Sequence, residues 1–120
     1  MKNVISKTWQ LILATVLISS QVAAEPQQAT CPQEFLQVSV HNEATMCQIF
    51  DASEHALSQS MSYFVALSPA QLISYYQSQH PQLSVHSSVN QRVLLTMQNN
   101  KTRVAISQDQ QGAQVDILIL

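Results

Sequence analysis

The last third of the chain, Arg92 to Leu120, constrains the fold most, because its apolar residues alternate through two turns without losing register. The pattern predicts antiparallel strands over Arg92–Gln98, Lys101–Ser107 and Ala113–Ile119, joined by a two-residue loop at Asn99–Asn100 and a four-residue loop at Asp109–Gly112. Strand side chains alternate between the two faces of a sheet, so this register gathers the apolar residues on one face. The predicted pairs are Val93 with Ile106, Leu95 with Val104, Met97 with Thr102, Ile106 with Val115, Val104 with Ile117 and Thr102 with Ile119.

The residues in the two predicted loops suit turns. Asn99 and Asn100 tolerate the left-handed backbone conformation that tight hairpins need. Gly112, the only glycine in the chain, lies where a longer loop would use its conformational freedom. The turn chemistry therefore agrees with the alternation of the strands.

One helix is predicted before this meander. Ser68 is a favoured N-cap residue and Pro69 a favoured first helical residue, while Pro81 ends the helix at His80. A helix of this length is not stable alone, so we expect its apolar face to lie on the sheet. That face consists of Leu72, Ile73 and Tyr76.

Shorter apolar alternations predict further strands at Thr45–Phe50, Ser60–Ala66 and Leu83–Ser88, the last with Leu83 and Val85 pointing inward. Phe35–Val40 alternates as a strand would, but Pro32 also makes a good first turn for a helix, and both interpretations stay open. Asp51–Ser60 is interpreted as a loop with a single helical turn as an alternative. Strands with one helix predict an α+β fold, a two-layer sandwich in which the helix covers an antiparallel sheet.

The N-terminus has the pattern of a secretory signal peptide. Lys2 and Lys7 precede an apolar run, and small residues offer a cleavage site after Ala24. The run is shorter than the roughly 20 residues of a membrane span, although an uncleaved anchor is the alternative. We therefore expect a signal peptide over residues 1–24, a disordered leader over 25–30 and one domain over 25–120, in the periplasm or secreted.

The charge of the expected mature chain argues against two classes of partner. Residues 25–120 carry three Lys and Arg residues against seven Asp and Glu residues, a formal net charge of −4. Nucleic acids and anionic membranes are bound by clusters of Lys and Arg, which this chain lacks. We expect neither a nucleic-acid partner nor a stable membrane anchor after signal cleavage.

Cys31 and Cys47, the only cysteines, both follow the expected cleavage site. An even number of cysteines in an exported chain predicts a disulfide bond. Closing this loop is worth about 3 kcal/mol in the chain-entropy model. The alternative, a reactive thiol with His41 as base, has no Cys-x-x-Cys spacing to support it.

No pattern of catalytic or metal-binding residues stands out. His41, Glu43 and Cys47 have the right atoms for a metal, but a Cys31–Cys47 disulfide would remove the thiolate ligand. The chain has no Gly-x-Ser-x-Gly motif, and a single glycine excludes a glycine-rich phosphate loop. We expect no cofactor, no metal and no enzymatic activity.

Two surfaces are candidate binding sites. Tyr63, Tyr75 and Tyr76 would line an apolar pocket between helix and sheet, with core packing as the alternative. The second surface is the other face of the C-terminal strands, where a small apolar patch has a charged rim, as in partner-binding or dimer surfaces. It comprises Leu94, Arg103, Ala105, Asp116 and Leu118, with Arg103 diagonal to Asp116. Coverage of this face by the Cys31–Phe50 segment is an equally good structural interpretation.

Three segments together resemble small exported proteins that are common in Gram-negative bacteria. They are Ser-Met-Ser-Tyr-Phe at 60–64, Leu-Ser-Pro-Ala-Gln-Leu-Ile-Ser-Tyr-Tyr at 67–76 and Gln-Val-Asp-Ile-Leu at 114–118. The resemblance covers about half of the chain and implies export and an α+β architecture, but it carries no catalytic residues. We therefore expect a non-enzymatic binding or accessory protein that acts through the outer sheet face on another envelope protein or a second copy. A small-ligand carrier is the alternative.

Overall fold

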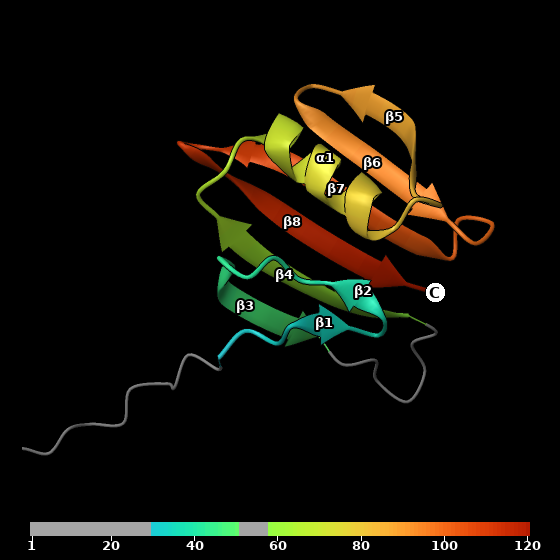
Figure 1. Cartoon of the computed structure of the whole chain (residues 1–120), viewed down its shortest axis with the longest axis horizontal. Coiled ribbons are helices and arrows are strands. Elements are labelled where there is room, and N and C mark those ends of the chain that lie inside the picture. The colour runs from blue at the N-terminus through green and yellow to red at the C-terminus, as the bar shows by residue number, and fades with distance from the viewer. Residues whose placement is uncertain (1–29, 51–57) are drawn as a thin grey trace, which may run out of the picture.

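The computed structural model describes residues 30–50 and 58–120 (Figure 1). The expected signal peptide, the leader up to residue 29 and the predicted turn after Asp51 lie outside the described residues. The elements are β1 (Glu34–Phe35), β2 (Val38–Ser39), β3 (Thr45–Phe50), β4 (Gln59–Val65), α1 (Pro69–Gln79), β5 (Ser84–Val89), β6 (Arg92–Met97), β7 (Thr102–Asp109) and β8 (Gly112–Ile119).

Six strands form one antiparallel sheet in the order β3-β4-β8-β7-β6-β5. The helix α1 connects β4 to β5 and packs on one face of this sheet, so the predicted α+β two-layer fold is confirmed (Figure 1). The last strand, β8, pairs with β4 as well as with β7. This long-range pairing joins the C-terminal meander to the first half of the domain.

The predicted register of the meander is confirmed at every pair, including Val104 opposite both Leu95 and Ile117. The first turn is centred on Asn99–Asn100, and the Lys101 N–H closes it by donating to the Gln98 carbonyl at 3.1 Å. The predicted four-residue second loop is wrong. Pairing continues to Asp109 and Gly112, which leaves only two residues, numbers 110 and 111, in the turn.

Gly112 is therefore a strand residue, and its backbone does not use the positive φ open to glycine. Gln110 takes the left-handed conformation in this turn instead, with φ 56°. The reason for a glycine is close packing, because a Cβ atom at position 112 would lie 2.5 Å from both the Phe64 ring and the Val65 carbonyl oxygen. The glycine lets β8 approach β4 closely.

The predicted helix is confirmed together with its start signal. Ser68 Oγ accepts from the Gln71 N–H, and the Gln71 side chain accepts from the Ser68 N–H, which completes a capping box. Leu72 and Tyr76 are fully buried against the sheet. Ile73, also expected on this face, is partly buried and packs against the same core.

The Phe35–Val40 segment is neither the continuous strand nor the helix that the sequence left open. Leu36 and Gln37 both adopt positive φ, so the chain turns back and β1 pairs with β2 as a small hairpin. The turn brings Phe35 and Val38 into the core together, with Val40 just beyond. The alternation that suggested a strand grouped Leu36 with Val38 and Val40, but Leu36 is 48% exposed and Phe35 is buried in its place.

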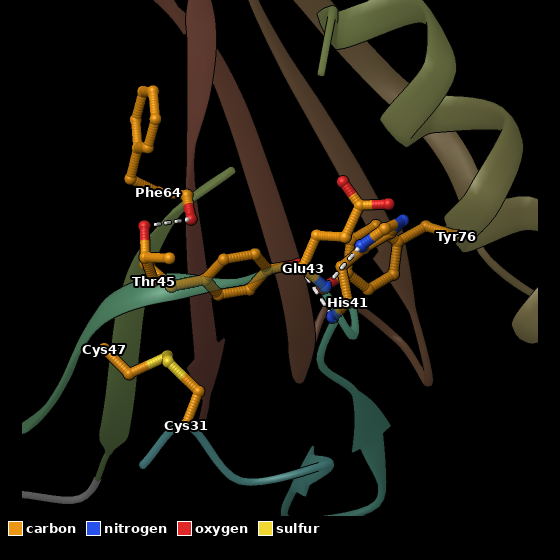
Figure 2. The surroundings of a disulfide bond; sticks show 8 residues. Cys31, His41, Glu43, Thr45, Cys47, Phe64 and Tyr76 are labelled. Atoms are coloured by element: carbon orange, nitrogen blue, oxygen red, sulfur yellow. Dashed lines mark hydrogen bonds between the residues drawn. A yellow bond between two sulfur atoms is a disulfide. The ribbon is translucent and has the colours of Figure 1, made fainter. Parts of the chain in front are cut away.

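This N-terminal hairpin packs on the same face of the sheet as α1, where Figure 1 shows both in front of the strands. The Ser39 N–H donates to His80 Nε2 at 3.0 Å, and the His41 N–H donates to Tyr63 Oη at 3.4 Å. The Cys31–Cys47 disulfide, with a Cα–Cα distance of 5.4 Å, ties the hairpin to β3 and confirms the predicted bond (Figure 2). Coverage of the opposite face by this part of the segment is therefore excluded.

The edge strand β5 departs from one prediction. Leu83 is buried as expected, but Val85 is 51% exposed. Val85 pairs with Leu95, and the register of β5 then shifts before Ser87. Because β5 is an edge strand, Val85 lies on the inner face but beyond the part of the sheet that α1 and the N-terminal hairpin cover.

Candidate functional site

The outer face of the sheet, opposite α1 and the N-terminal hairpin, carries a groove of about 520 Å³. Its volume lies in the range of ligand and anchor-residue sites, and its walls come from all four inner strands and both edge strands. The lining residues are Phe50, Ser60, Met61, Ser62, Ser87, Val89, Arg92, Leu94, Arg103, Ala105, Asp116, Ile117 and Leu118.

All five residues that the sequence placed on an outer binding patch line this groove. The register explains their proximity, because Leu94 lies opposite Ala105, Ala105 opposite Asp116, and Arg103 opposite Leu118. Within residues 30–50 and 58–120, no helix or hairpin packs over this patch, which consists of Leu94, Arg103, Ala105, Asp116 and Leu118.

The hollow arises from small side chains at the centre of the face. Ser62, Asp116 and Ala105 follow one another directly across β4, β8 and β7. Larger apolar side chains stand around them, including Leu118 beside Ser60. Small residues flanked by bulkier ones leave a depression in a surface that would otherwise be even.

Residues of both edge strands contribute to the groove. Phe50 belongs to edge strand β3 and Val89 to edge strand β5, yet both line the same groove. In a flat sheet the two edges would lie roughly 24 Å apart, from strand spacings of about 4.8 Å. Both residues are more than half exposed, at 52% and 63%. The twist that antiparallel sheets adopt therefore turns these two apolar side chains toward one site.

The charges of the groove differ from the expected arrangement in one respect. The register places Arg103 diagonal to Asp116 as expected, but the ion pair of Asp116 is with Arg92, at 3.6 Å. Gln114 Nε2 donates to Asp116 Oδ1 at 2.9 Å, and Arg103 Nε donates to the Asn100 carbonyl at 2.9 Å. Arg92 is 59% exposed, so its ion pair adds little to stability.

Sequence reasoning missed the contributions of Phe50, Arg92, Val89 and three serines to this site. Alternation within β4 does place Ser60 and Ser62 on the outer face, opposite to Met61. The missing information was the neighbour of β4. Only its pairing with β8 brings these serines beside Leu118 and Asp116.

The three tyrosines of the alternative ligand pocket do not line a common cavity. Tyr63 and Tyr76 are buried in the core, 2% and 0% exposed, and their hydroxyls share a hydrogen bond of 2.5 Å. Burial raises the pKa of Tyr63 to about 12, although hydrogen bonds from Tyr76 and the His41 N–H lower it in part. Burial raises the pKa of Tyr76 further, and the nearby Tyr63 adds to the effect.

Tyr75 lies apart, at a surface depression of about 550 Å³ beside the disulfide. Its ring packs against His41 with ring centroids 4.6 Å apart, and partial burial raises its pKa. The depression is otherwise lined by residues of the N-terminal segment, including Cys31 and Val40. It does not continue into the core where Tyr63 and Tyr76 lie buried.

The possible metal ligands of the N-terminal segment have other partners. His41 Nδ1 accepts from the Glu43 N–H at 3.0 Å, and Cys47 is bonded to Cys31 (Figure 2). In the described part of the chain, no three or more His, Cys, Asp or Glu side chains group as a metal site would need. His55 lies outside the described residues.

Residues 30–50 and 58–120 include no helix with the length and apolar character of a membrane span. A scan against protein-family models, a search of curated proteins and a search of solved structures each found no match to this chain.

Proposed function

We propose that this chain is an exported, non-enzymatic binding protein that docks another protein through the groove on its outer sheet face. The observation that carries the proposal is the groove itself, lined by Phe50, Leu94 and Leu118 with arginines beside them. Aromatic residues and arginine are enriched where protein partners meet, and apolar side chains in a depression make good anchor sites.

The opposite face supports this assignment by contrast. Met61, Val104 and Ile117 are fully buried in the core that α1 and the N-terminal hairpin cover, so among residues 30–50 and 58–120 this core is closed without any element on the outer face. The outer apolar side chains are therefore not needed to close the described core. A protein partner that covered these side chains would remove their apolar surface from water, which favours binding.

Export is the part of the proposal that rests on the N-terminus. Residues 1–24 have the pattern of a signal peptide, and the Cys31–Cys47 disulfide is the kind of bond that persists in the periplasm or outside the cell. N-terminal sequencing of the protein recovered from the producing cells tests this directly. We expect the mature chain to begin at Glu25.

The binding proposal is tested by site-specific photo-crosslinking in the producing cells. A photoreactive residue at Leu118 lies in the groove, and the same residue at Gln77 lies on the exposed side of α1. We expect a discrete crosslinked protein from position 118 that is absent from position 77. The identified protein, once purified, should bind the wild-type chain and lose affinity for Leu94→Asp.

Crosslinks that are the same from both positions, or a purified candidate that binds Leu94→Asp as well as wild type, would contradict the proposal. Circular dichroism of Leu94→Asp serves as the folding control. The small-ligand carrier has weaker support, because Tyr63 and Tyr76 fill the space between helix and sheet.

A further inference from the structure

The outer-face groove is positively charged on a chain that is otherwise acidic. Its lining includes Arg92 and Arg103 against one acid, Asp116, a formal charge of +1. The rest of residues 30–50 and 58–120 carries Lys101 against three acids, Glu34, Glu43 and Asp109, a formal charge of −2. The groove thus attracts anions although the protein as a whole does not.

Neither arginine is neutralised strongly within the described chain. The Arg92–Asp116 contact is 3.6 Å long, both side chains are solvent-accessible, and such pairs exchange partners at little cost. Arg103 uses Nε to bind the Asn100 carbonyl, and no carboxylate of the described residues forms an ion pair with it. Its terminal guanidinium nitrogens can therefore bind a carboxylate with two parallel hydrogen bonds.

Apolar surface lies next to these arginines. Leu118 is opposite Arg103 on the neighbouring strand, and Leu94 is two residues from Arg92 on the same face of β6. A ligand that satisfies both features needs an apolar side chain and a carboxylate close together. A short segment of a protein supplies both when Asp or Glu adjoins a Leu, Phe or similar residue.

From this geometry we propose that the occupant of the groove is a segment of a partner protein in which an acidic residue adjoins a bulky apolar residue. This inference rests on the proposed function and names the kind of partner. A symmetric dimer through this face is disfavoured, because it would oppose two faces of the same positive charge. Two arginines are also fewer than the basic cluster that anionic membranes attract.

The test selects short random peptides displayed on phage against the purified, disulfide-bonded protein. We expect the selected peptides to pair an acidic residue with a neighbouring large apolar residue. Arg103→Glu should weaken their affinity about ten- to hundredfold, because a charge-assisted hydrogen-bonded pair is lost. Fluorescence anisotropy measures this affinity. The matched control is Lys101→Glu, which makes the same charge change outside the groove and should leave affinity nearly unchanged. Selection against Arg103→Glu itself should enrich Lys or Arg in place of the acid.

Three results would overturn the inference in distinguishable ways. The first result is a set of selected peptides that carry no charge, bind Leu118→Asp poorly and bind Arg103→Glu as well as wild type. This would refute the acidic partner and leave the proposed function standing. If the affinity of every selected peptide is unchanged by Leu118→Asp, the result counts against both the acidic partner and the proposed function. A dimer in sedimentation equilibrium that Leu118→Asp dissociates would replace the acidic partner with a second copy.

Discussion

The two faces of the sheet are built by the same strands but differ in what covers them. Along β8, Val115 and Ile117 are fully buried on the inner face, whereas Asp116 and Leu118 between and beyond them line a groove on the outer face. The inner face gained cover from a helix and a disulfide-tied hairpin. Alternation alone therefore gives two surfaces, and the helix and hairpin that cover only the inner face make that face the core.

The difference in burial between the two faces is tested most strongly by a matched pair of substitutions at neighbouring positions. Ile117→Asp places a charge in a site with 0% exposure and should cost about 5 kcal/mol or more, enough to abolish cooperative unfolding. Leu118→Asp places the same charge beside Arg103 and should cost less than about 1 kcal/mol. Urea denaturation followed by circular dichroism measures both, and equal losses would show that the faces are equally buried.

The cover of the inner face depends in part on the disulfide. Replacing both Cys31 and Cys47 by Ser should lower the free energy of unfolding by about 3 kcal/mol, because the unfolded chain regains the freedom of a 16-residue loop. The wild-type protein in reducing agent should show the same lower urea midpoint. An unchanged midpoint would mean that the hairpin holds its place without the bond.

Close approach of β8 to β4 gives the next largest effect. Gly112→Ala puts a Cβ atom 2.5 Å from the Val65 carbonyl oxygen, so the strands must shift at a cost of about 1–3 kcal/mol. Gln111→Ala, in the exposed turn one residue earlier, is the control and should change stability by less than about 0.5 kcal/mol. If the two variants are equally stable, packing is not the reason for the glycine.

The buried tyrosines predict a smaller, pH-dependent effect. Burial raises the pKa of Tyr63 from 10.0 to about 12 in the folded chain, so the unfolded state loses its proton first as pH rises. The stabilisation is present below pH 10 and is lost as the pH rises through about 12. Tyrosinate absorbance and circular dichroism should change together in this window, and the Tyr63→Phe, Tyr76→Phe double variant should resist the change. Ionisation of both residues in a folded chain near pH 10 would contradict their burial.

Local patterns in the sequence were sufficient for several parts of the fold. Alternation gave the register of the meander, the Ser68–Pro69 pair gave the helix start, and the cysteine count gave the disulfide. These features depend on neighbouring residues or on simple pairing rules. The two-residue turn before Gly112 was missed because the glycine is required by Phe64, a residue far away in sequence.

The candidate site could be predicted only in part. The five outer residues predicted from β6, β7 and β8 do line the groove, since they belong to the meander whose register was known. The other side of the groove comes from β4 and the two edge strands. The positions of β4 and its neighbour β3 depend on the pairing of β4 with β8, and β5 is placed by its pairing with β6, in which the register shifts before Ser87. Alternation within one strand carries no information about these neighbours.

The most direct test of the difference between the two faces is carbene footprinting of the intact, folded protein, read residue by residue by mass spectrometry. We expect labelling at Leu118 and Phe50 on the groove, with Ile117 and Val104 protected beneath the helix and hairpin. A peptide from the selection described above should then protect Leu118 most strongly and Phe50 to a lesser degree, and leave the labelling of Ile117 and Val104 unchanged. Leu118 as strongly protected as Ile117 in the free protein would contradict an open groove on the outer face.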